Sequence, residues 1–190
     1  MKGLAYLHGK NKIHRDIKAA NIFINLNGVC KLGDFGVSAE LKQKNEKRKT
    51  VVGSPYWMPP EMITNEGYTE KADIWSIGVV CFELAEGAPP YYNLPPVRAM
   101  FMIPKGEKPQ LSEQTHWSFD FKNFVSICLE RDVDKRPQAD SLLKHPLFRG
   151  NLKKHVKSLI NLLQPTFKMP FDVAEGDETI QGFDGQSKFE

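Results

Sequence analysis

The segment from Ala72 to Ala85 limits the possible folds of this chain more than any other feature of its sequence. It reads Ala-Asp-Ile-Trp-Ser-Ile-Gly-Val-Val-Cys-Phe-Glu-Leu-Ala, which is apolar on nearly every side of a helix. A helix without a polar face belongs in the middle of a core rather than on its surface. Gly87, followed by two prolines, is a typical signal for the end of such a helix. We therefore expect other elements to pack around this helix.

Further helices are predicted on both sides of that segment. Residues 1–8 read as the last turns of a helix that ends at Gly9. An amphipathic helix follows the central one, and its apolar face has the spacing i, i+3, i+4, i+7 and i+8 at Phe121, Phe124, Val125, Cys128 and Leu129. A shorter helix covers residues 139–144 and stops before Pro146. The chain is thus expected to be mainly α-helical.

A small β-hairpin is predicted from two β-type runs, residues 22–24 and 29–32. Asn27-Gly28 lies between them, and Asn-Gly favours a type I′ turn because both central residues of that turn need a positive φ. A turn centred there would place Asn21 opposite Asp34. Two polar residues far apart in sequence would then lie side by side at the open end of the hairpin.

The composition is that of a soluble globular protein of 190 residues, with 41% hydrophobic and 26% charged residues. The net charge of +3 is small, so nothing favours nucleic-acid or membrane binding. Three widely spaced cysteines indicate reduced thiols rather than disulfides or a metal site. No secretory signal and no apolar run of about 18 residues is visible. We expect a cytoplasmic protein, with the nucleus as a second location.

Two further segments lie outside the expected core. Residues 35–60 lack periodicity and carry a basic run from Lys42 to Lys49, which favours a solvated loop over a surface that steers a partner. Residues 151–164 predict an amphipathic helix, for which packing against the rest of the chain is favoured over pairing with a second copy. Residues 165–190 have the acidic, Gly-containing composition of a disordered tail.

Three short motifs in fixed order carry the chemistry. Residues 14–21 (His-Arg-Asp-Ile-Lys-Ala-Ala-Asn) fit the pattern H-R-D-x-x-x-x-N, and Asp-Phe-Gly follows at residues 34–36. Met-Pro-Pro-Glu stands at residues 58–61, where an A-P-E triplet would close the set. A chance match of this register has a probability of about one in a billion per start position. From about residue 3 to residue 150, the chain resembles the protein kinases.

This resemblance implies a fold and a domain layout. Residues 1–150 would form the C-terminal lobe of a protein kinase, an α+β fold that is mainly α with a small β-hairpin. Residues 14–21 would be the catalytic loop, and residues 34–61 the activation segment.

The resemblance also implies roles for single residues. Phosphoryl transfer depends on positioning and charge neutralisation more than on covalent chemistry. Asp16 would accept the proton of the substrate hydroxyl, and Asn21 and Asp34 would bind Mg²⁺ through oxygen atoms. Lys18 would bind ATP and stabilise the transferred phosphoryl group. Phe23 takes the position that forms the floor of the adenine pocket, where leucine is usual.

Lys18 and Ser54 resemble the serine/threonine branch of the kinases, which implies protein substrates phosphorylated on Ser or Thr. Ser54 would lie where the substrate backbone docks. Asp73 is predicted to cap the N-terminus of the central helix, stabilising it by about 1 kcal/mol, and the resemblance implies a second role, holding the backbone of the catalytic loop. Glu61 and Arg136 resemble the ion pair that holds the activation segment to the lobe.

Two stretches narrow the resemblance to the sterile-twenty-like group. Residues 50–58 resemble its T-x-x-G-T-P-x-W-M sequence, and residues 95–104 resemble germinal-centre kinases, especially the Hippo-type members. Ser54 and Pro59 depart from the usual threonine and alanine. The resemblance implies that Thr50 is phosphorylated, either within a kinase dimer or by an activating kinase. A phosphate there could order the loop against Arg15.

The sequence has no G-x-G loop, and only 13 residues precede His14. A small lobe that covers ATP is therefore missing from this chain. Positioning contributes about 7–11 kcal/mol to lowering a typical barrier, so we expect negligible phosphate transfer by the chain alone. The alternative is a non-catalytic short form that binds partners or substrates of an intact kinase.

Overall fold

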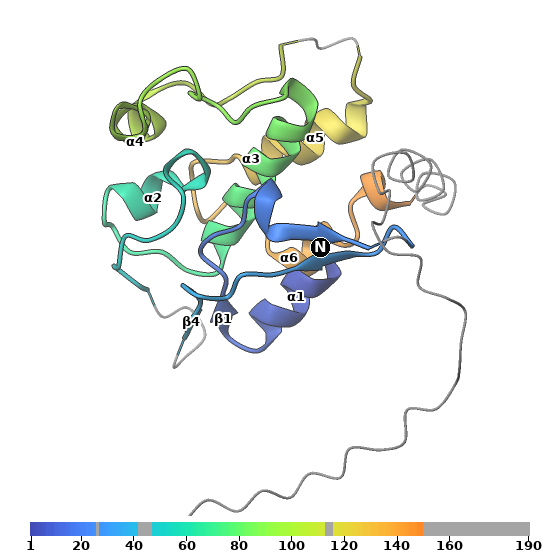
Figure 1. Ribbon diagram of the computed structural model, residues 1–190. Coiled ribbons are helices and arrows are strands. Elements are labelled where there is room, and N and C mark those ends of the chain that lie inside the picture. Colours follow the sequence, from blue (N-terminus) through green and yellow to red (C-terminus); the bar gives the residue numbers. More distant parts are fainter. Residues whose placement is uncertain (26, 42–46, 113–115, 150–190) are drawn as a thin grey trace, which may run out of the picture.

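The computed structural model describes residues 1–25, 27–41, 47–112 and 116–149 (Figure 1). The predicted helix at residues 151–164 and the predicted tail at residues 165–190 lie outside the described residues, as does the first part of the basic run, residues 42–46.

The predicted central helix is α3 (Lys71–Glu86), which lies in the middle of the molecule (Figure 1). Nine consecutive residues, 72–80, are buried, so the helix has no exposed face over more than two turns. It ends at Gly87, which adopts a left-handed φ of 81° and donates its N–H to the carbonyl oxygen of Glu83. The prediction that other elements pack around this segment is confirmed.

Helices on several sides cover α3. One buried cluster joins Ile74 and Ile77 of α3 to α1 (Lys2–Gly9), α5 (Phe119–Cys128) and α6 (Ala139–Leu142). A second cluster joins Trp75 and Val79 to α5 and to α4 (Pro96–Lys105). At Gly78 a Cβ atom would lie 2.8 Å from the Cβ of Cys128, so glycine permits the close approach of α3 and α5.

The remaining elements are short. Strand β1 (Lys12–Ile13) pairs antiparallel with β4 (Ala39–Glu40), and β2 (Ile22–Ile24) pairs antiparallel with β3 (Cys30–Leu32). The others are 3₁₀ helices η1 (Ala19–Asn21), η2 (Pro55–Trp57) and η3 (Pro146–Phe148), and helix α2 (Pro60–Ile63). None of the helices in the described residues is long and apolar enough to span a membrane.

The predicted hairpin is present, but its predicted register is wrong by one residue. Ile24 pairs with Cys30, and Asn21 accepts the N–H of Gly33 (3.0 Å), so Gly33 rather than Asp34 lies opposite Asn21. The cause is the turn. The carbonyl oxygen of Asn25 accepts the N–H of Gly28 (2.9 Å), and of Asn27 and Gly28 only Gly28 has a positive φ, 71°. A type I′ turn at Asn27-Gly28 would need a positive φ at both residues, so the turn is not of that type.

A buried ion pair connects α2 to the loop after α5. Arg136 is 1% exposed, and its two terminal nitrogens donate to the two carboxylate oxygens of Glu61 at 2.7 and 3.1 Å. Its Nε donates to the carbonyl oxygen of Glu130 (2.8 Å), and its guanidinium lies 5.2 Å from the ring centre of Trp75. The planar guanidinium thus joins three segments of the chain beside the central helix.

Replacing Arg136 should strongly destabilise the fold. Arg136→Ala would leave the 5%-exposed Glu61 carboxylate buried without its partner, and we expect a loss of about 3–5 kcal/mol in the free energy of unfolding. Urea denaturation followed by circular dichroism measures this loss. Lys135→Ala is the matched control, because the Lys135–Asp132 pair is exposed to solvent and should contribute little to the free energy of unfolding. Equal losses in the two variants would contradict the prediction.

Candidate active site

Four donor groups, from the three residues Lys18, Asn21 and Ser54, surround the carboxylate of Asp16. Asn21 Nδ2 donates to Oδ2 (3.0 Å), and the Lys18 ammonium lies 3.0 Å from the same oxygen. The N–H and the hydroxyl of Ser54 both donate to Oδ1, each at 2.9 Å. Lys18 Nζ also donates to the Ser54 hydroxyl oxygen (2.8 Å), which closes the network. The structure therefore brings Asp16, Lys18, Asn21 and Ser54 together.

The same contacts determine the ionisation state of the Asp16 carboxyl group. Partial burial by itself would raise the pKa of this carboxyl, but the hydrogen bonds from Lys18 and Ser54 outweigh it. The result is a pKa below the ordinary value of 3.8, so the carboxylate is ionised across the physiological range.

The loop that carries Asp16 is bonded to the central helix through Asp73. The Asp73 carboxylate is fully buried and accepts the backbone N–H groups of His14 and Arg15, each at 2.8 Å. His8 of α1 lies 2.8 Å from the same carboxylate. The N-cap reading of Asp73 is wrong, because α3 begins at Lys71 and the cap position is Glu70. The Asp73 oxygens point to the loop instead of to the first amides of the helix.

His14 connects this loop to the Asp-Phe-Gly segment. Its ring is fully buried, with Nε2 3.0 Å from the carbonyl oxygen of Gly33 and the ring centre 4.9 Å from that of Phe35. The sequence offered no specific role for His8 or His14, since no ligand spacing was visible. His14 belongs to the H-R-D motif, but its contacts with Gly33 and Phe35 can be seen only in the folded structure.

The two residues predicted to bind Mg²⁺ lie near one end of the hairpin. Both Nδ2 contacts of Asn21 go to Asp16, to its backbone oxygen (2.9 Å) and its Oδ2, so the amide oxygen is the atom left for a cation. Asp34 is exposed, has a φ of 58°, and accepts the N–H of Gly36 at 3.3 Å. Across the described residues there is no group of three or more His, Cys, Asp or Glu side chains suited to a metal.

These oxygen atoms nevertheless fit Mg²⁺. Protein sites for this ion use one or two carboxylates together with waters and the phosphates of a nucleotide, not a complete cage of side chains. Asn21 and Asp34 would supply such oxygen ligands, through the amide oxygen and the carboxylate.

Phe23 lies on β2 with 58% of its surface exposed. Its ring covers Gly33 so closely that a Cβ atom at that position would collide with it. The aromatic face is therefore held at the hairpin, next to the segment that carries Asp34.

A polar link joins Arg15 to Thr50. Arg15 donates to the carbonyl oxygen of Ser38 and to the hydroxyl of Tyr68, both at 3.3 Å. Tyr68 in turn donates to the carbonyl oxygen of Thr50 (2.9 Å), whose side chain is exposed. Tyr68 could not be predicted from the sequence, because a single tyrosine after a glycine carries no pattern that would indicate this contact.

Gly53 sets the approach of Ser54 to Asp16. Its φ of 113° lies in a region that favours glycine, and a Cβ atom there would collide with the backbone oxygen of Arg15. The segment containing Ser54 can therefore lie directly on the catalytic loop.

The chain matches the protein kinase domain family over residues 1–148. It is similar to serine/threonine-protein kinase hippo of Drosophila melanogaster, with 48% identity over 166 residues, which are 87% of this chain and 24% of that protein. Serine/threonine-protein kinase 4 homolog A of Dictyostelium discoideum is 51% identical over 157 residues, covering 82% of this chain and 34% of the relative. Serine/threonine-protein kinase pakB of the same organism is 50% identical over 149 residues, covering 78% and 18%. The chain thus spans about a third or less of the length of these relatives.

The low pKa of Asp16 gives a test of the network. Carboxyl-carbon NMR should place its titration midpoint below 3.8, and Ser54→Ala or Lys18→Met should each raise it. Because folding lowers this pKa, the stabilisation from Asp16 is complete above about pH 4 and is lost as the pH falls through the folded-state value. A midpoint at or above 3.8, or one that neither variant moves, would contradict the assigned contacts.

Proposed function

Because this chain belongs to the protein kinase domain family, with sterile-twenty-like serine/threonine kinases among its relatives, we propose that it supplies the catalytic loop for transfer of the ATP γ-phosphate to Ser and Thr hydroxyls of proteins. The observation that carries the proposal is the Asp16 carboxylate, ionised and oriented by Lys18, Asn21 and Ser54.

Asp16 orients the hydroxyl of the substrate and takes its proton. The hydroxyl oxygen forms a bond to the γ-phosphorus, the bond from that phosphorus to the bridging oxygen breaks, and ADP leaves. Lys18 already contacts both Asp16 and Ser54, so its ammonium is close to the negative charge of the phosphoryl group. A low pKa suits this role, because a loose transition state needs an oriented acceptor more than a strong base.

Asn21 and Asp34 hold Mg²⁺ in this proposal, through the amide oxygen and the carboxylate. When bound, the ion neutralises the charge of the phosphate groups. Phe23 presents its exposed ring to the adenine of ATP, and the proximity of Phe23 to Gly33 supports a single site for the nucleotide and the ion.

Ser54 is proposed to lie beside the backbone of the protein substrate, since its hydroxyl and N–H already reach the catalytic carboxylate. A kinase dimer or an activating kinase would phosphorylate Thr50.

We propose a cytoplasmic location, with the nucleus as a second one, which fits the use of ATP and the three free cysteines. Burial raises the pKa of the Cys81 thiol to about 12, so this thiol remains protonated and unreactive.

Replacement of Asp16 tests the catalytic role. The segment that precedes the matched region in the Drosophila hippo relative would be fused before Met1, and transfer of labelled phosphate from ATP to myelin basic protein measured. Asp16→Asn should lower the rate by about 10²–10⁴, because the hydroxyl loses its proton acceptor. Asp140→Asn, on the exposed side of α6, is the matched control and should leave the rate unchanged.

Two results would overturn this role for Asp16. One is a rate that survives Asp16→Asn. The other is a folded fusion that binds the protein substrate without transferring phosphate, which would favour the non-catalytic binding alternative.

Thr50 tests the proposed regulation. Thr50→Ala should lower the rate of the same fusion by about tenfold or more, because no phosphate can then order the loop against Arg15. Thr64→Ala, at another exposed threonine, serves as the control. Phosphopeptide mass spectrometry should find phosphate on Thr50 in the active protein. Full activity of protein that carries no phosphate there would contradict the prediction.

A further inference from the structure

Tyr68 lies on the segment between α2 and α3, outside the activation segment, yet it contacts that segment at two points. It is 1% exposed, and its ring belongs to a buried cluster with Ile13, Met62 and Ala72. A hydroxyl group in such surroundings needs hydrogen-bond partners, because burying it without them is costly. The packed ring determines where this hydroxyl lies and which partners it meets.

The backbone of Tyr68 makes the first contact with the activation segment. It forms an antiparallel bridge with Arg48, in which the N–H of each residue donates to the carbonyl oxygen of the other at 2.9 Å. Gly67 permits this approach, because its φ of 87° favours glycine and a Cβ atom there would lie only 3.1 Å from the Cβ of Lys47. The backbone two residues before Thr50 is therefore paired with the segment that carries Tyr68.

The hydroxyl of Tyr68 makes the second contact and extends it to the catalytic loop. It donates to the carbonyl oxygen of Thr50 (2.9 Å) and accepts a hydrogen bond from the Arg15 guanidinium (3.3 Å). A phenol hydroxyl can donate one proton and accept another, so both of its roles are used. Arg15 directly precedes Asp16, and its backbone N–H is held by Asp73. The hydroxyl thus links Thr50 to the residue next to the catalytic carboxylate.

Arg15 is in contact with two separate parts of the activation segment. Its guanidinium donates to the carbonyl oxygens of Val37 and Ser38 near the start of the segment, and it reaches Thr50 through Tyr68. The side chain of Thr50 is exposed, whereas its backbone is held by the hydroxyl of Tyr68. A phosphate on that side chain would meet a loop that is already ordered, so less of its interaction energy would be spent on ordering.

We propose that Tyr68 is a positioning residue for phosphate transfer: its hydroxyl connects Thr50 to Arg15, so that a phosphate on Thr50 acts on the catalytic loop. This inference rests on the proposed phosphorylation of Thr50. Phenylalanine would serve the apolar contacts of the ring equally well, so a role in the fold alone does not require the hydroxyl. Tyr68→Phe separates the two roles, because it keeps the ring and removes only the oxygen.

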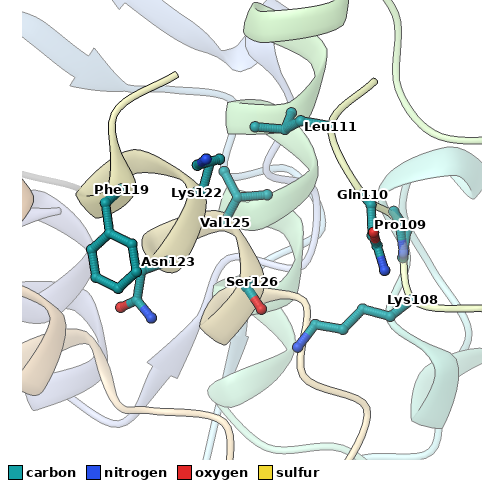
Figure 2. Close-up of a pocket in the computed structure, with 9 residues that line it drawn as sticks. All are labelled: Lys108, Pro109, Gln110, Leu111, Phe119, Lys122, Asn123, Val125 and Ser126. Carbon is teal, nitrogen blue, oxygen red and sulfur yellow. The ribbon is translucent and has the colours of Figure 1, made fainter. Parts of the chain in front are cut away.

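The connection is tested in the 190-residue chain, without ATP or phosphate, by amide hydrogen exchange measured by NMR. Tyr68→Phe should speed exchange at the Arg48 amide by about fivefold, because losing the hydrogen bond to Thr50 loosens the bridge two residues away. The amide of Ser126 in α5 (Figure 2) is the internal reference, since α5 packs in two other buried clusters. Its exchange rate should not change.

Tyr91→Phe is the matched control for the loss of a hydroxyl. Tyr91 lies between α3 and α4, and its hydroxyl likewise donates to a backbone carbonyl oxygen, that of Glu107 (3.3 Å). In this variant the Arg48 amide should exchange as it does in the unmodified chain.

The effect on phosphate transfer is measured in the fusion that tests Asp16, with myelin basic protein as the substrate. Tyr68→Phe should lower kcat about fivefold and leave the KM values for ATP and for the protein unchanged, because the hydroxyl bonds to protein groups on both sides. Combined with Thr50→Ala, the same substitution should change kcat less than about twofold, since no phosphate is then present for Tyr68 to act on. Tyr91→Phe should leave kcat unchanged.

Unchanged exchange at the Arg48 amide in Tyr68→Phe would overturn the connection, whether or not the fusion transfers phosphate. An equal fall in kcat with and without Thr50→Ala would also overturn the proposal, because Tyr68 would then support the fold independently of Thr50. If Thr50→Ala alone leaves the rate unchanged, the proposed regulation fails, and the role of Tyr68 fails with it.

Discussion

The buried carboxylate of Asp73 is the interaction on which the site depends. It accepts the N–H groups of His14 and Arg15, and thereby joins the central helix to the catalytic loop. Arg15 has a φ of 71°, a conformation that costs about 1–3 kcal/mol for a residue other than glycine. Two hydrogen bonds to a charged acceptor offset that cost. Without these hydrogen bonds, nothing would offset the cost of the backbone conformation that positions Asp16.

From this anchored loop, contacts extend to the two segments that complete the site. His14 reaches Gly33, which precedes Asp34, and Asp16 is bonded to Ser54 of the activation segment. The Glu61–Arg136 pair then holds the far end of that segment to the lobe. The described residues next to Asp34 and Ser54 have little secondary structure of their own. Their positions are therefore determined by contacts to the loop and the central helix rather than by local propensity.

The sequence predicted the elements that have a strong local pattern. The apolar stretch around Trp75 could be buried only in the core. The spacing of Asp16, Asn21 and Asp34 indicated that these residues belong to one site. The hairpin register could not be predicted, because it depends on a bond from Gly28 to Asn25 that competes with the type I′ turn. Asp73 was ambiguous for a similar reason: a carboxylate in the first turn of a helix can accept from that helix or from another segment, and only tertiary structure decides.

The contacts of Asp16 also indicate what kind of catalyst the site can be. A carboxylate whose pKa is lowered by Lys18 and Ser54 is a poor base in the ground state. Phosphoryl transfer tolerates this, because the hydroxyl proton becomes acidic only as its oxygen bonds to phosphorus, late in a loose transition state. The donors from Lys18 and Ser54 that weaken Asp16 as a base also keep it ionised, and together with Asn21 they hold the carboxylate in one orientation. The geometry thus favours orientation over basicity, and this fits phosphate transfer better than a reaction that must remove a proton before the first bond forms.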